Sequence, residues 1–256
     1  MTTMTPQQIE LVKSTVSILR EHGVALTTYF YNRMLNNHPE LKNTFNMDSQ
    51  TSGRQPKALA TAVLAYAENI ENPSVLAKAI ERITTKHVSL NIQPNQYEIV
   101  GENLLHSISE VLNVPMESDL IDAWKAAYLQ LAAILIDVEK AKYQTLSTQT
   151  GGWAGWRDFV ITEIQTYESG KIINLKPQNG DPILAGEAGD IISVRVKLTE
   201  NDLLQPQQFK FENQQNDQYQ INVKNEDQPS VYSVQNTLIK HYQVGDLVQI
   251  SAPVKF

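Results

Sequence analysis

Apolar residues recur every three or four positions along the first part of the chain, a spacing that gathers them on one face of an α-helix. Thr5 followed by Pro6 has the form of an N-cap and a first helical position, and later segments also begin with proline. The pattern predicts an all-helical domain with short connections. The expected helices cover about residues 6–22, 24–35, 54–70, 73–87, 94–111 and 116–143, with one helical turn at 39–41.

The apolar pattern changes after a Gly151-Gly152 pair, which predicts a linker. Beyond this pair, apolar residues alternate with polar ones over short stretches, and this period of two predicts the strands of an antiparallel β-barrel. The expected strands lie near residues 159–166, 191–198, 219–223 and 247–250. Residues 205–227, rich in Gln, Asn and Asp, are expected to form hairpin loops or a partly mobile segment. We therefore expect a multidomain α + β protein, all-α over residues 1–147 and a small antiparallel barrel over residues 148–256.

The composition excludes several classes of function. The chain has 21 Lys and Arg and 28 Asp and Glu, which gives a net charge of −7. The sequence contains no basic stripe that could neutralise phosphates, so a nucleic-acid partner is not expected. The chain has no cysteine, which excludes disulfides, thiolate zinc sites, cysteine nucleophiles and thiolate-ligated haem. Neither a bilayer-spanning apolar run nor a signal peptide is found in the sequence, so the expected location is cytoplasmic, with no membrane partner.

Three polar residues from separate helical segments are candidates for a shared site: His87, Tyr97 and Glu139. Imidazole is a common metal ligand, although a single His is more often an ordinary core or surface residue. Glu139 closes an apolar run over residues 131–138 in which Asp137 is charged, and its ordinary interpretation is an exposed carboxylate beside lysines. The residues by themselves leave both alternatives open.

Five motifs carry a family resemblance: Tyr29-Phe30-Tyr31-Asn32-Arg33-Met34, Leu41-Lys42-Asn43-Thr44-Phe45-Asn46-Met47, Lys86-His87, Gln96-Tyr97-Glu98-Ile99-Val100-Gly101-Glu102 and Gly151-Gly152-Trp153. The first part of the chain resembles the globin domain of the flavohaemoglobins, and the remainder resembles their flavin-binding barrel of the ferredoxin-reductase type. The resemblance implies haem b, with His87 as the axial ligand of the iron. It also implies that Glu139 makes the imidazole a stronger donor and that Tyr97 helps to hold this carboxylate.

On the other face of the haem, the resemblance places Tyr31, Gln55 and Leu59, and it stacks Phe45 against the haem edge. A phenol or an amide stabilises the partial negative charge of a bound diatomic gas, so Tyr31 is the expected main donor and Gln55 the second. Leu59 is expected to restrict access. Pro56 biases Gln55 away from the helical conformation, so the geometry of Gln55 is expected to differ from the family pattern. The alternative for Tyr31, Phe45 and Leu59 is plain core packing.

The resemblance implies an oxidoreductase that combines O2 and nitric oxide to nitrate, with Tyr31, Tyr97 and Glu139 as catalytic residues. In the family, a flavin passes electrons from a nicotinamide to the iron, and three sequence marks hold that flavin. The Arg-X-Tyr-Ser, Gly-X-X-Ser and Pro-Gly-Gln-Tyr marks become Gln207-Gln208-Phe209-Lys210, Tyr232-Ser233-Val234-Gln235 and Ala188-Gly189-Asp190-Ile191. These changes predict that FAD is not bound. No Gly-X-Gly-X-X-Gly pattern occurs, which predicts that NAD(P)H is not bound either.

Three functions remain open from the sequence. The first is a nitric oxide dioxygenase that receives electrons from an external reductase or a small reductant. The second is a non-enzymatic haem protein that binds O2 or nitric oxide as a sensor, buffer or store and uses its barrel to bind a partner. The third is a barrel that binds a different ligand in the vacated flavin cleft. The set of His87, Tyr97, Glu139 and Tyr31 favours retained haem reactivity, whereas the altered flavin marks favour a role without turnover.

Overall fold

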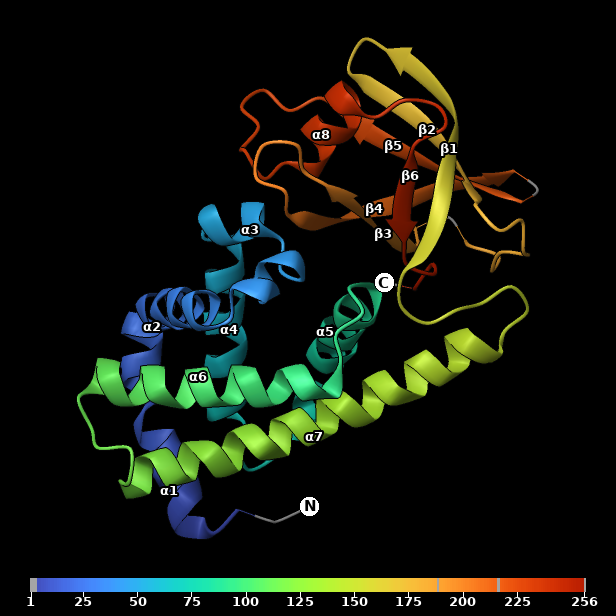
Figure 1. Cartoon of the computed structure of the whole chain (residues 1–256). Coiled ribbons are helices and arrows are strands. Elements are labelled where there is room, and N and C mark those ends of the chain that lie inside the picture. The colour runs from blue at the N-terminus through green and yellow to red at the C-terminus, as the bar shows by residue number, and fades with distance from the viewer. Residues whose placement is uncertain (1–3, 188, 216, 256) are drawn as a thin grey trace. The chain divides into compact units, whose positions relative to one another are not determined.

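The computed structural model describes residues 4–255 except 188 and 216 (Figure 1). The contacts of the described chain divide it into two compact units. The first unit contains residues up to 41, residues 49–83 and residues 93–138. The second unit contains residues 42–48, residues 84–92 and the residues from 139 onward. The second unit therefore includes two short segments from the helical half of the chain.

Helices build the first unit, as the apolar spacing predicts. The helices up to residue 148 are α1 (Pro6–Ser14), α2 (Val16–Asn37), η1 (Pro39–Asn43), α3 (Met47–Thr51), α4 (Arg54–Glu68), η2 (Pro73–Leu76), α5 (Ala77–Ser89), α6 (Pro94–Leu112) and α7 (Asp119–Thr148), where η marks a 3-10 helix. Thr5 caps α1 as predicted, because its side chain accepts a hydrogen bond from the Gln8 N–H while the Gln8 side chain accepts one from the Thr5 N–H. None of the helices in the described residues has the length and apolarity needed to cross a membrane.

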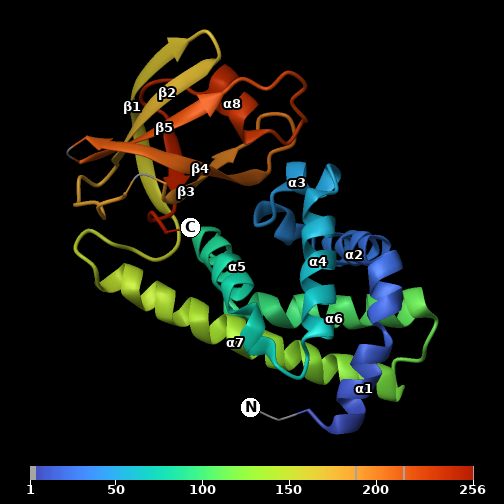
Figure 2. The same ribbon diagram turned by 180° about the vertical axis from the view of Figure 1, so that it is seen from behind.

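The predicted helix over residues 6–22 is two helices, and its expected end at Gly23 is wrong. The chain changes from α1 to α2 at Thr15, and α2 continues through Gly23 to Asn37. Gly23 lies inside the helix, where a Cβ would meet the Cβ of Ala60 in α4 at an ordinary 3.5 Å. Figure 2 shows α2 beside α4.

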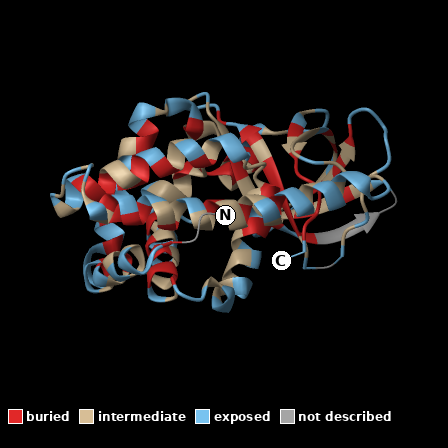
Figure 3. Cartoon of the chain, turned by 90° about the horizontal axis from the view of Figure 1, so that it is seen from below, coloured by how far each residue is buried: buried red, intermediate tan, exposed pale blue. Residues whose placement is uncertain are grey.

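Buried and exposed positions alternate along the helices, as Figure 3 shows. Phe30 in α2 and Ile108 in α6 are among the largest fully buried side chains of the first unit. Gly101 in α6 lets the ring of Tyr128 in α7 lie directly against the helix backbone, since a Cβ at Gly101 would come within 2.4 Å of that ring. The Tyr128 hydroxyl donates to the backbone carbonyl of Tyr97 at 2.5 Å, which joins α7 to α6.

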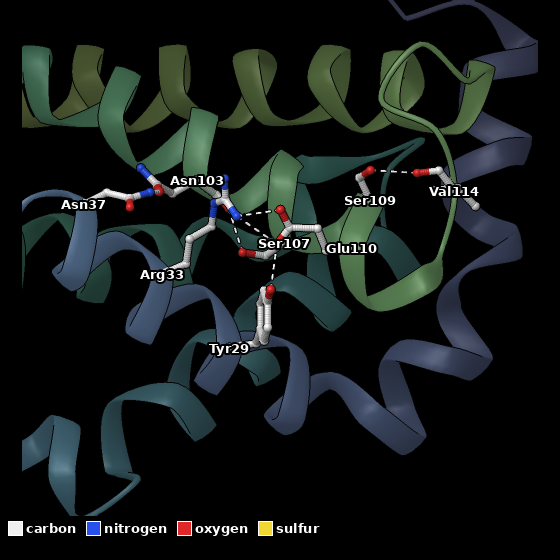
Figure 4. A network of polar contacts seen from close by, with 8 residues as sticks. All are labelled: Tyr29, Arg33, Asn37, Asn103, Ser107, Ser109, Glu110 and Val114. Carbon is white, nitrogen blue, oxygen red and sulfur yellow. Dashed lines mark hydrogen bonds and ion pairs between the residues drawn. The ribbon is translucent and has the colours of Figure 1, made fainter.

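A surface network ties α2 to α6 (Figure 4). Arg33 donates to the Glu110 carboxylate at 2.6 Å, and the Tyr29 hydroxyl donates to the same carboxylate at 2.7 Å. The hydrogen bond from Tyr29 lowers the pKa of Glu110, so this carboxylate keeps its charge. The network fixes the outer face of α2, while Tyr31, two residues further along the helix, is buried.

The strands of the second unit close into an antiparallel barrel, as predicted, and their order in the barrel is β1-β2-β5-β4-β3-β6 (Figure 1). The strands are β1 (Arg157–Tyr167), β2 (Gly170–Pro177), β3 (Ile191–Lys197), β4 (Leu204–Gln215), β5 (Gln218–Lys224) and β6 (Leu247–Ile250), and α8 (Val234–His241) precedes the last one. Closure gives each strand two neighbours, which removes the free edges that an open sheet would expose.

The stretch over residues 205–227 is not mainly loop, so that prediction is wrong. It forms most of β4 and all of β5, because its few apolar residues alternate with the polar ones and point into the barrel. Phe209, Phe211, Tyr219 and Ile221 are all buried. Strand pairing on both sides satisfies the backbone, so the polar side chains between them do not prevent a strand.

Candidate functional site

His87 and Glu139 form a polar pair in the second unit. His87 lies near the end of α5, and Glu139 lies in α7. The His87 Nδ1 is 2.7 Å from the Glu139 Oε1, and the Glu139 side chain is 3% exposed. A buried carboxylate is costly unless it is paired, and the imidazole N–H supplies the partner. Glu139 is therefore not the exposed carboxylate of the ordinary interpretation.

This hydrogen bond distinguishes the two ring nitrogens. When Nδ1 donates its proton to Glu139, Nε2 keeps the lone pair that a metal ion needs. The His87 side chain is 31% exposed, so its ring is not sealed inside the fold. Burial, and then the charge of Glu139, raise the pKa of Tyr143, whose hydroxyl stays protonated and donates to the Ile92 carbonyl at 2.8 Å. This bond holds the turn that follows α5.

Apolar packing also holds the end of α5. Val88, the residue after His87, is buried and packs with Ile191 and Val254, with Tyr143 against the same cluster. The position of the His87 backbone therefore depends on contacts inside the second unit.

Phe45 lies in the segment Lys42–Asp48, which β4 holds through Gln205. The Gln205 side chain is fully buried; its Oε1 accepts from the Met47 N–H at 2.8 Å, and its Nε2 donates to the Lys42 carbonyl at 2.5 Å. One amide therefore bonds both ends of the turn that carries Phe45. The sequence did not predict this residue, because a glutamine in a polar stretch gives no signal of burial.

Tyr31 is the centre of a second polar group, which lies in the first unit. Its side chain is buried, and the side chains of Gln55 in α4 and Gln50 in α3 lie beside the phenol. Burial raises the pKa of Tyr31 to about 12, although the Gln55 and Gln50 side chains oppose this effect. The phenol therefore keeps its proton at neutral pH and is able to donate it. Leu59 lies one turn beyond Gln55 and is half-buried.

Gln55 is helical although Pro56 follows it, so the predicted bias away from helix is wrong. The chain turns at Gly53, which has a φ of +74°, and α4 begins at Arg54. Pro56 thus lies in the first helical turn, where its missing N–H costs no hydrogen bond within the helix. The Thr27 hydroxyl donates to the Pro56 carbonyl at 2.8 Å and ties this turn to α2.

Gln50 belongs to the Tyr31 group but was not predicted from the sequence. Its Nε2 is buried and has no hydrogen-bond partner among the described residues. Leaving a buried donor unpaired costs about 1–3 kcal/mol, so this atom indicates a polar partner that the chain itself does not provide. An orphaned amide beside a protonated phenol fits the electronegative end of a diatomic ligand, and the His87 and Glu139 pair fits the axial donor of a haem.

Tyr97 is buried in α6, and its backbone carbonyl accepts the hydrogen bond from Tyr128. It belongs to the first unit, whereas Glu139 belongs to the second. The role of Tyr97 in holding the Glu139 carboxylate stays a prediction.

The first altered flavin mark lies in β4. The Gln208 Nε2 donates to the Ser89 hydroxyl at 2.7 Å, and the Gln207 Oε1 accepts from the Asn46 amide at 3.1 Å. Phe209 is buried in the barrel core. The polar side chains at this mark are therefore bonded to other parts of the second unit.

The second altered mark lies at the start of α8. Ser233 caps the helix, and Ser233 and Gln235 both donate to the carboxylate of Glu226, the latter at 2.8 Å. The start of a helix favours an anion, and here the chain's own carboxylate bonds to it. In the third mark, Ala188 lies outside the described residues.

Comparison with known proteins gives the family. The Globin family model matches residues 28–135. The Flavohemoprotein of Bordetella pertussis is 44% identical over 254 residues, which cover 98% of this chain and 63% of that protein. The solved bacterial globin from Campylobacter jejuni is 42% identical with a TM-score of 0.52, over 55% of this chain and 99% of that one. This chain belongs to the flavohaemoglobin-related globins, and it spans about 63% of the length of the Bordetella relative.

A solved structure matches both halves of the chain. The flavohaemoglobin from Malassezia yamatoensis, solved with bound FAD and haem, is similar over all of this chain and 65% of its own, with a TM-score of 0.87 and 25% identity. The predicted order of a helical globin part and an antiparallel barrel is confirmed. The expected lack of FAD is not supported, since the relatives are named flavohaemoproteins and this neighbour contains FAD. Family membership supports haem and the binding of diatomic gases.

Proposed function

We propose that the chain binds haem b through His87, binds O2 and nitric oxide, and combines the two gases to nitrate. The hydrogen bond of 2.7 Å between His87 and the buried Glu139 is the observation that carries the proposal. We assign the haem domain to residues 1–147 and the barrel domain to residues 148–256.

Glu139 acts through His87 in this proposal. A carboxylate that accepts the Nδ1 proton gives the imidazole more negative character and makes Nε2 a stronger donor to iron. Burial of the Glu139 carboxylate, which is 3% exposed, strengthens this effect on its side of the pair. Tyr97 is proposed to hold the carboxylate in place, and Phe45 is proposed to pack against the haem edge.

Tyr31 is the proposed donor to the gas ligand, with Gln55 beside it and Leu59 limiting access. The raised pKa of Tyr31 keeps the donating proton on the phenol over the whole neutral range. Haem, when bound, supplies the iron at which O2 and nitric oxide combine. The chain's own residues orient the axial imidazole, hold a proton near the ligand and exclude water.

Repeated turnover would need an electron for the haem iron after each reaction, and we propose that a reductase or small reductant outside this barrel would supply it. The polar side chains of the β4 and α8 marks, which bond within the second unit, support this assignment. The same bonds favour the second candidate, a haem protein that binds gas without turnover and uses the barrel to bind a partner.

Nitric oxide consumption separates the candidates. The haem-loaded chain would be mixed with O2 and nitric oxide, first alone, then with NADH, then with NADH and an added flavin reductase. The proposal predicts one turnover without a reductase and sustained nitrate formation with it. Sustained consumption with NADH alone, together with flavin absorbance released on denaturation, would contradict the external donor. No nitrate in any mixture would leave gas binding without turnover.

A further inference from the structure

Two glutamine amides flank the Tyr31 phenol, and the family resemblance implies only Gln55. The other, Gln50, lies near the end of α3, where its backbone carbonyl accepts from the Gly53 N–H at 3.1 Å. Gly53 adopts a φ of +74° and turns the chain into α4, so one tight turn presents both amides to the same phenol.

The two glutamines differ in whether their amide nitrogen has a hydrogen-bond partner. The Gln55 side chain also lies beside the phenol, but its amide nitrogen is not among the buried atoms of the described residues that lack a partner. The Nε2 of Gln50 is shielded from solvent and has no acceptor within the described residues. An amide N–H in this state gains a hydrogen bond as soon as an acceptor enters, whereas an engaged amide has to exchange one partner for another.

We propose that Gln50 is the second hydrogen-bond donor to the gas ligand, beside the Tyr31 phenol, and that Gln55 mainly orients this phenol. The inference rests on the proposed binding of haem and gas. It deepens that function by assigning a positioning role to Gln55 and direct contact with the ligand to Gln50.

Carbon monoxide is a suitable probe, because its stretching frequency in the infrared reports the hydrogen bonds at the ligand and does not depend on turnover. The haem-loaded full chain would be compared with Gln50→Leu, with Gln50→Glu and with Gln55→Leu as the matched control. Both Gln50 variants should raise the C–O frequency, since each removes the amide donor. Gln50→Leu should also speed O2 release about fivefold, the effect of losing one ordinary hydrogen bond. Gln55→Leu should change both quantities less.

An unchanged C–O frequency in the Gln50 variants, with a clear shift in Gln55→Leu, would overturn the assignment. The Soret band and the denaturation midpoint show whether each variant is folded and loaded. If Gln50→Leu does not fold, Gln50→Glu gives the same comparison with the side-chain size kept. Failure of the unaltered chain to take up haem would remove the proposed function itself, whereas a loaded Gln50 variant with an unshifted frequency removes only this inference.

Discussion

Glu139 lies 52 residues beyond His87 in the chain, and its Oε1 is 2.7 Å from the His87 Nδ1. Two helices, α5 and α7, each contribute one member of this pair. When the His87 Nδ1 carries the proton, it donates to the buried Glu139 side chain and Nε2 keeps its lone pair. In the proposed function, the strength of His87 as a donor to iron would therefore depend on a residue that does not touch the metal.

Glu139→Gln should keep haem but weaken donation by His87, because a neutral amide replaces the carboxylate. Resonance Raman spectra of the ferrous protein should show a lower iron–histidine stretching frequency. Asp137→Asn is the matched control, since Asp137 is exposed on the same helix. Equal frequencies in Glu139→Gln and the unaltered protein would show that the carboxylate does not act on the imidazole.

Tyr31→Phe should speed O2 release about tenfold, because the donor hydroxyl is lost while the ring still packs. Rapid mixing with carbon monoxide measures the release rate. Tyr29→Phe is the control, since the Tyr29 hydroxyl bonds to Glu110 on the surface (Figure 4). Tyr31 has no distal role if the two variants release O2 at the same rate.

The stability of the fold should fall at alkaline pH in part through Tyr31. Folding raises the pKa of Tyr31 from 10.0 to about 12, so between these values the folded chain keeps a proton that the unfolded chain loses. This contribution is complete below the unfolded pKa and disappears as the pH rises through the folded pKa. Between about pH 9 and about pH 11.5, urea unfolding should show a larger loss for the unaltered protein than for Tyr31→Phe, by up to about 2 kcal/mol. Identical losses would mean that burial does not hold this proton.

Gln205→Ala should destabilise the fold by about 2–4 kcal/mol, because the Met47 N–H and the Lys42 carbonyl lose their buried partner. Urea unfolding midpoints measure this loss. Gln165→Ala in β1 is the control, since Gln165 is exposed and should change stability by less than about 0.5 kcal/mol. Equal urea unfolding midpoints for the two variants would show that Gln205 does not stabilise the segment that carries Phe45.

Gly101→Ala and Gly23→Ala should have opposite effects although both glycines are helical. A Cβ at Gly101 would lie 2.4 Å from the Tyr128 ring, and this overpacking should cost about 1–3 kcal/mol. A Cβ at Gly23 meets Ala60 at an ordinary 3.5 Å, so the better helix propensity of alanine should stabilise by up to about 1 kcal/mol. Thermal unfolding of both variants tests the comparison, and destabilisation by Gly23→Ala would contradict it.

The kinds of secondary structure were predictable because burial is periodic in helices and strands. The failures lie where packing between elements outweighs a local signal. Gly23 does not end α2, which continues through it to Asn37 with Gly23 buried, and Gln55 is helical because its proline falls in the first turn of α4. The polar composition around Gln205 predicted loops, but this stretch forms a strand. Its backbone groups hydrogen-bond to the neighbouring strands of the barrel.

The candidate site was predictable only in part. Nothing local in the sequence distinguishes Glu139 from an exposed carboxylate, and the family resemblance supplied its pairing with His87. Gln50 and Gln205 gave no signal at all, because amide side chains are common on surfaces and their burial depends on residues distant in sequence.

Haem binding through His87 is tested by the visible spectrum of the chain expressed with ample porphyrin, measured beside that of His87→Ala. We expect a strong Soret band in the unaltered protein and its loss in His87→Ala, with both proteins folded. A colourless unaltered protein, or an equal Soret band in His87→Ala, would contradict haem binding through this imidazole.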